Sequence, residues 1–169
     1  MSSARLHELY FGSLGGDGAV LFTGSGDGTG LPKPVAAALE QQFGGPAAWQ
    51  REFIALARAL GGRSGWVVLS YGRDNGRLYN QIVGDGSPLV IDTAPLLVLD
   101  MYEHAYHQEF GANTSAYVDA FMRNVDWPAV AQRLTQAAGR TDPLRNNGDT
   151  VPSITVEELM ARCARAEPL

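Results

Sequence analysis

The spacing of hydrophobic residues along the chain predicts helices toward both ends and strands in the middle. Apolar residues recur at helical spacing in six segments, 4–14, 34–43, 46–60, 101–110, 115–125 and 127–134. Runs with the length and composition of strands occupy three segments, 65–71, 78–83 and 95–99. Because the strands follow one another instead of alternating with helices, this order is typical of an α+β fold with helices around a three-stranded antiparallel sheet.

Local signals support several of these elements. Ser3 is a candidate N-cap of the first helix. An Asn-Gly pair at 75–76 lies between the first two strands and is the strongest short-range signal for a hairpin turn. Trp49, Phe53 and Leu60 share one face of the third helix, so we expect them in the core.

Residues 15–30 are rich in glycine, which raises the question of a nucleotide-binding loop. Such a loop follows a buried strand and opens directly into a helix. Here the preceding element is predicted to be helical, and residues 31–34 intervene before the next helix. The segment is therefore interpreted as a surface loop.

The composition changes after the last predicted helix of this group. Residues 139–150 are rich in Asn, Asp, Gly and Pro and are predicted to form a linker. Regular structure resumes at 151–169, where Thr155 and Glu158 have the spacing of a capping box. The predicted organisation is a domain at 1–138, a linker and a C-terminal helix.

Charge and composition exclude several classes of protein. The net charge of −5 argues against binding to a nucleic-acid backbone. The chain contains no apolar stretch of about 18 residues that would predict a membrane span, and its first residues lack the apolar segment of a signal peptide. Cys163 is the single cysteine, so no internal disulfide forms. We expect a cytoplasmic protein without nucleic-acid or membrane partners.

Candidate chemistry lies at the end of the third predicted strand. The buried run stops at Asp100, and His104 follows four residues later. A carboxylate and an imidazole on a rigid element can hold one metal ion if a further ligand comes from elsewhere, and His7 in the first helix is a candidate. The same spacing is also compatible with an aspartate that starts a helix and a histidine packed in the core.

Four motifs in order along the chain resemble those of iron/manganese superoxide dismutases. Asp-Met-Tyr-Glu-His-Ala-Tyr at 100–106 resembles the family signature Asp-x-Trp-Glu-His-Ala-Tyr. His-Glu-Leu-Tyr-Phe at 7–11 is similar to the His-x-x-Phe-Trp helix, and Ser-Gly-Trp at 64–66 to a Gly-Ser-Gly-Trp strand start. Residues 124–133 resemble the closing helix with its Val-Asn-Trp motif. The resemblance covers residues 5–134 and implies the fold of the family's C-terminal domain.

The resemblance also implies an activity and a set of site residues. It implies disproportionation of superoxide by one iron or manganese ion per chain, with His7, Asp100 and His104 as three of the family's four protein ligands. Glu103 would reach a ligand histidine of the partner subunit in a homodimer and fix its orientation.

Three other positions receive roles from the same resemblance. Trp66 and Tyr102 would form walls of the metal pocket. His107 occupies a position where the family often has a tyrosine that faces the partner's site, so it would either join the proton network or pack at the interface. Trp66 and Tyr102 are equally suited to be ordinary core residues.

The chain departs from the family pattern in three ways. The motifs begin after the family's N-terminal helical hairpin, which supplies the fourth protein ligand. The position of a glutamine or histidine that binds the metal-bound solvent is taken by Gly86, with Asp85 adjacent and Gln81 nearby in a predicted strand. Phe11 and Tyr102 replace tryptophans.

These departures leave three functions open. The first is a superoxide dismutase, as a fragment or a reduced variant. The second is a non-catalytic relative that serves as a binding or regulatory subunit without the redox metal. The third is another metal-dependent oxidoreductase coupled to sulfur chemistry, because Ile-Thr-Val-Glu-Glu-Leu at 154–159 resembles the start of a rhodanese-like domain.

Overall fold

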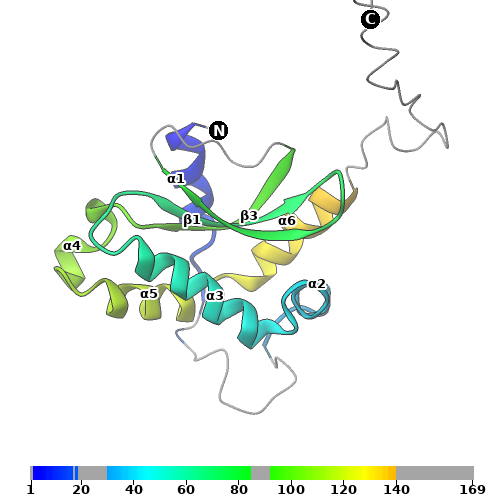
Figure 1. The fold of residues 1–169 in the computed structure, drawn as a ribbon, viewed down its shortest axis with the longest axis horizontal. Helices are drawn as coiled ribbons and strands as arrows, with labels where there is room; N and C mark the ends of the chain where they lie inside the picture. The colour runs from blue at the N-terminus through cyan, green and yellow to red at the C-terminus, as the bar shows by residue number, and fades with distance from the viewer. Residues whose placement is uncertain (1, 17, 19–29, 85–91, 140–169) are drawn as a thin grey trace, which may run out of the picture.

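The computed structural model describes residues 2–16, 18, 30–84 and 92–139. Three helices precede the strands: α1 (Ser3–Phe11), α2 (Lys33–Phe43) and α3 (Pro46–Ala59). The strands follow in succession: β1 (Trp66–Gly72), β2 (Leu78–Val83) and β3 (Thr93–Asp100). Three more helices end the described chain: α4 (Glu103–Phe110), α5 (Thr114–Arg123) and α6 (Trp127–Gly139). The predicted α+β fold is confirmed (Figure 1).

The three strands form one antiparallel sheet in the order β2-β1-β3. The predicted hairpin joins β1 to β2, and Gly76 in its turn has a φ of 70°, a conformation that glycine adopts at low cost. In the β1–β3 pairing Trp66 lies opposite Asp100. The register thus brings an indole and a carboxylate together at the end of the sheet where α4 begins.

The core fills the space between this sheet and the helices. In Figure 1, α3, α4 and α5 lie together below the sheet, while α1 and α6 both pack against the edge strand β3. Trp49 and Phe53 of α3 are fully buried, and Leu60 is 8% exposed, as the helical spacing predicts. The Trp49 indole N–H donates a hydrogen bond to the Asn80 side chain at 3.0 Å, so its one polar atom is satisfied.

The ends of several helices differ from the prediction. The N-cap of α1 is Ser2, not Ser3, because the Ser2 hydroxyl accepts the Arg5 N–H while its own backbone is extended. The helix ends at Phe11 instead of residue 14, since Leu14 forms a β-bridge with Val125. The last helix continues beyond the predicted end at residue 134, as far as Gly139.

The start of the glycine-rich segment is held against the rest of the fold. The N–H groups of Gly15 and Gly16 both donate to the Asn124 carbonyl, at 3.0 and 2.9 Å. A Cβ on Gly16 would lie 2.7 Å from the Asn124 main chain, so only glycine allows this approach. The remainder of the predicted loop falls largely outside the described residues.

Other predictions also fall outside the described part of the chain. These are the linker from 140 onward, the C-terminal helix with its rhodanese-like motif, Cys163, and the loop that contains Asp85 and Gly86. Gln81 does lie in a strand, as predicted, and its side-chain amide donates to the Ser70 hydroxyl. No helix in the described part of the chain combines the length and apolar character needed to cross a membrane.

Candidate metal centre

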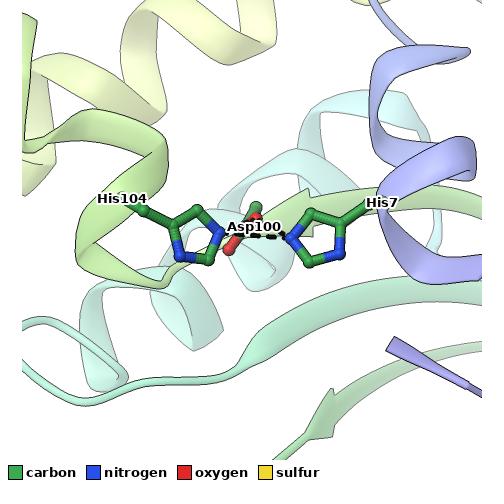
Figure 2. A group of neighbouring side chains, drawn as sticks. All are labelled: His7, Asp100 and His104. Atoms are coloured by element: carbon green, nitrogen blue, oxygen red, sulfur yellow. Dashed lines mark hydrogen bonds and ion pairs between the residues drawn. The ribbon is translucent and has the colours of Figure 1, made fainter. Parts of the chain in front are cut away.

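Three elements that are distant in the sequence bring His7, Asp100 and His104 together (Figure 2). His7 comes from α1, Asp100 ends β3, and His104 lies in the first turn of α4. The two Nε2 atoms are 3.2 Å apart, and Asp100 Oδ2 lies 3.1 Å from His104 Nε2 and 3.6 Å from His7 Nε2. Both imidazoles therefore direct the same ring nitrogen toward one carboxylate oxygen.

Asp100 is the buried and fixed member of this cluster. Its side chain is only 1% exposed. Its Oδ1 accepts the Tyr102 N–H at 2.9 Å, which leaves Oδ2 directed at the histidines. Burial raises the pKa of this carboxyl, and the Tyr102 amide and the His104 imidazole act in the opposite direction. A positive charge beside Oδ2 would compensate for the burial of the carboxylate.

The contact between Asp100 and Tyr102 also explains a difference from the prediction. The sequence pattern places the start of this helix at residue 101, but α4 begins at Glu103. The hydrogen bond from the Tyr102 N–H to the carboxylate holds residues 101 and 102 in a turn, so the helix begins only after them. The interpretation of Asp100 as a helix-start aspartate is not confirmed, since the N-cap of α4 is Tyr102 and no side chain caps it; Oδ1 of Asp100 holds a turn before the helix, and Oδ2 faces the cluster.

The backbone of α1 determines which ring nitrogen of His7 faces the cluster. Nδ1 lies 3.0 Å from the Ser3 carbonyl oxygen, and a carbonyl can only accept, so Nδ1 carries the proton and donates it. In the neutral ring Nε2 is then unprotonated, with its lone pair toward Asp100. A hydrogen bond on the far nitrogen is the usual way in which proteins orient a histidine ligand.

Aromatic rings border the cluster on two sides. The Trp66 indole meets the His7 ring edge to face at 4.7 Å, and the Tyr102 ring stacks on His104 at 5.6 Å. Trp66 is buried and Tyr102 is half-buried. The imidazoles keep contact with solvent, because the side chain of His7 is 34% exposed and that of His104 is 58% exposed. The cluster therefore has apolar walls and an open side.

The three donor atoms have the chemistry and the spacing that one metal ion needs. Two ligand atoms that each lie about 2.1 Å from one ion, with angles of about 90–120° between them, are separated by roughly 3.0–3.6 Å. The three measured separations all fall in this range. Two imidazoles and one carboxylate suit iron, manganese or zinc. Within the described residues, His7, Asp100 and His104 could therefore hold a metal ion.

Two of the predicted site residues lie outside this cluster. Glu103 and His107 are exposed on α4, one turn apart. Both line a cleft of about 480 Å³ between α4 and the connection that follows α3. Neither side chain is part of the metal-ligand group that the described residues form.

Two tyrosines support Asp100 from neighbouring helices, and the sequence pattern gave neither of them a role in the site. The Tyr117 hydroxyl of α5 donates to the Asp100 main-chain oxygen at 2.7 Å and is hydrogen-bonded to the Tyr10 hydroxyl of α1 at 3.1 Å. Burial raises the pKa of both phenols. Helical spacing identified the buried faces, but the only signal for a polar role was that a buried hydroxyl requires a partner.

Comparisons with known proteins agree with the motifs. A family model described as iron/manganese superoxide dismutases, C-terminal domain, matches residues 32–133. The chain is 45% identical over 136 residues to an iron superoxide dismutase of Cupriavidus metallidurans, an alignment that covers 80% of this chain and 64% of that relative. It is 33% identical over 139 residues to a manganese superoxide dismutase of Mycolicibacterium smegmatis, covering 82% of this chain and 62% of the relative.

A third relative, an iron superoxide dismutase of Aquifex pyrophilus, is 32% identical over 143 residues, covering 83% of this chain and 61% of that protein. The chain thus spans less than two thirds of the length of these relatives. The family model nevertheless covers more than half of the chain, which confirms the predicted resemblance. The chain belongs to the iron/manganese superoxide dismutase family.

Proposed function

We propose that the protein is a superoxide dismutase, which converts two superoxide anions and two protons into oxygen and hydrogen peroxide. The observation that carries the proposal is the convergence of His7, Asp100 and His104 on one point, with both Nε2 atoms directed at Asp100 Oδ2. These residues would hold the iron or manganese ion that the names of the relatives specify for those proteins. When bound, the ion supplies the reversible one-electron change that the reaction needs.

The residues of the chain have distinct tasks in this proposal. The buried Asp100 carboxylate supplies negative charge toward the cation. The Tyr102 amide holds its Oδ1, and the Tyr117 hydroxyl holds the Asp100 main-chain oxygen. The Ser3 carbonyl holds the proton on Nδ1 of His7, so Nε2 stays available as a ligand. This hydrogen bond orients the ring from within α1, which limits the ordering that metal binding requires.

Access for the substrate follows from the exposure of the imidazoles. Superoxide is a small anion, and solvent can supply the two protons at the open side formed by His7 and His104. Trp66 and Tyr102 exclude water from the opposite side, because their rings pack directly on the two imidazoles. Charges in such a partly dry site interact more strongly than they do in bulk water.

The proposal includes a homodimer. Glu103 and His107 are exposed and share one cleft on the outer side of α4, where a partner subunit has access to them. The Glu103 carboxylate would there accept the N–H of a ligand histidine of the partner subunit. Sedimentation of the parent and of Glu103→Gln tests this part, and we expect the variant to shift toward monomer. A monomeric parent would refute it.

Metal retention tests the proposal as a whole. The purified chain is incubated with iron or manganese, desalted and analysed for metal, beside His104→Ala and the control Gln108→Ala on the exposed face of α4. We expect about one ion per chain in the parent and control, loss of the ion in His104→Ala, and dismutase activity that follows the metal content. A parent that retains neither metal would exclude catalysis by this chain alone and would leave a fragment of a dismutase or the non-catalytic relative.

A further inference from the structure

A second candidate site lies in a cleft between α1, the start of β3 and α6. The cleft has a volume of about 610 Å³, within the range of small-molecule sites. Arg5, Leu9 and Gly12 border it from one face of α1, and Ala94 and Pro95 border it from β3. We call it the α1–α6 cleft.

The polar side chains of this cleft are arginines and glutamines. Arg5 comes from α1, Arg73 follows β1, and Arg133 comes from α6 together with Gln132 and Gln136. No carboxylate is among the described residues that line the cleft. Three arginines from three parts of the fold thus line one space, in a chain whose net charge is −5.

The carboxylates that pair with two of these arginines lie outside the lining. Arg5 contacts Glu8 at 2.7 Å, and both side chains are more than half exposed. Arg73 contacts Asp92 at 3.4 Å, also near solvent. An exposed ion pair such as Arg5–Glu8 contributes little to stability, so it does not prevent the Arg5 guanidinium from turning toward a ligand.

Arg133 is the fixed member of the group. Its guanidinium donates to the Ser13 hydroxyl at 2.9 Å, to the Leu96 carbonyl at 2.8 Å and to the Gly12 carbonyl. Burial lowers the pKa of this guanidinium, the negative charge of Asp126 opposes this shift, and the positive charge of Arg5 adds to it. The cleft therefore holds positive charge in a partly desolvated position, where an anion would be most strongly attracted.

We propose that the α1–α6 cleft binds a small oxyanion, namely a phosphate group. Several guanidinium groups that approach from different elements match a tetrahedral dianion, which has acceptor oxygens in more directions than a planar carboxylate. The carboxamides of Gln132 and Gln136 can donate further hydrogen bonds, and Leu9 and Ala137 limit solvent at the inner wall. The source is either free phosphate or the phosphate of a phosphomonoester.

This site is separate from the metal cluster. Arg5 and His7 are two residues apart in α1, so their side chains point to opposite sides of the helix. On β3 the cleft is formed by Ala94 and Pro95 at the start of the strand, whereas Asp100 lies at its end. Binding of phosphate and retention of metal can therefore be measured as independent properties.

Calorimetric titration of the full chain with inorganic phosphate, at constant ionic strength, tests the proposal. The variant Arg5→Gln/Arg73→Gln removes two of the guanidinium groups and leaves Arg133 in place. The control Arg51→Gln/Arg77→Gln makes the same change in charge at two exposed positions outside the cleft. We expect at least a roughly tenfold weaker affinity for phosphate in the first variant and no change in the control.

Two results would overturn the proposal: a parent that does not bind phosphate, or equal weakening in both variants. Thermal unfolding and metal content of each protein show whether it is folded. A parent that binds phosphate but no metal would refute only the dismutase proposal.

Titrations with adenosine monophosphate and with adenosine identify the source of the phosphate group. If adenosine monophosphate binds more tightly than inorganic phosphate, the source is a phosphomonoester; if it binds more weakly, the source is free phosphate. Adenosine that binds as tightly as adenosine monophosphate would refute recognition of the phosphate group.

Discussion

Replacing Arg133 with methionine should destabilise the protein, because this guanidinium joins three elements. Its hydrogen bonds to Gly12 and Ser13 hold the end of α1, and its hydrogen bond to Leu96 holds β3. Methionine has a similar length and keeps the apolar part of the side chain, but it cannot donate hydrogen bonds. The substitution therefore removes the connection while it largely preserves the packing.

The size of the effect follows from these contacts. A hydrogen bond from a charged donor contributes about 1.5–3 kcal/mol to the free energy of unfolding. The substitution also relieves the cost of desolvating the half-buried guanidinium, which favours the variant. The two terms oppose each other, so we expect a net loss of roughly 3–5 kcal/mol in the free energy of unfolding. For a chain of 169 residues this corresponds to a decrease of roughly 6–20 °C in Tm.

Urea unfolding monitored by tryptophan fluorescence measures the change, with Arg123→Met on the exposed side of α5 as the matched control. We expect the control to stay within about 0.5 kcal/mol of the parent. Because α1 carries His7, Arg133→Met should also retain less metal after desalting. A loss below about 1 kcal/mol would show that the fold holds α1 without this guanidinium. It would refute the idea that Arg133 secures α1 to β3 and α6.

Three further changes test individual contacts. Tyr10→Phe removes the hydrogen bond to Tyr117 and should cost about 0.5–1.5 kcal/mol in urea unfolding near neutral pH. Because burial raises the pKa of Tyr10, the contribution of its hydroxyl to stability is fully present below a pH of about 10 and is lost as the pH rises further, through the pKa of the folded protein. The difference in free energy of unfolding between parent and variant should therefore narrow in alkaline solution. A difference that widens would contradict the raised pKa of Tyr10. Gly16→Ala should lower Tm, since its Cβ would meet the Asn124 main chain at 2.7 Å, and an unchanged Tm in a thermal scan would argue against this close approach. Trp49→Ala should cost about 3–5 kcal/mol, as expected for a fully buried aromatic residue; a loss under about 2 kcal/mol by urea unfolding would mean that the site collapses around the deletion.

The fold could be predicted from the sequence because its periodicities are local. Trp49 and Phe53 share a face by helical spacing, and an Asn-Gly pair marks the hairpin turn, so both features were evident without long-range information. The cap of α1 was misplaced by one residue because Ser2 and Ser3 are equally suitable in composition. Only the extended backbone of Ser2 distinguishes them.

The candidate site could be predicted only in part. Asp100 and His104 are four residues apart, so a strand end followed by a helix brings them together. His7 lies 97 residues from His104, so the residue types made it only a candidate third ligand, and the resemblance to a family gave it that role. The hydrogen bond from Tyr117 to the Asp100 carbonyl had no local signal, because its partner is a main-chain atom of another element. The orientation of the site depends on such contacts, and spacing along the chain does not reveal them.

The attachment of α1 has a consequence for the protein as it leaves the ribosome. Gly12 is held by a side chain that follows it by 121 residues. At a translation rate of 5–20 residues per second, about 6–24 s pass between the synthesis of these two partners. During that interval α1 has no completed docking surface, and His7 can meet its two neighbours in the cluster only once residues 100–104 have been made. Helix α1 is thus secured only after the strands and helices that follow it have been made, and the full cluster cannot form before His104 has been synthesised.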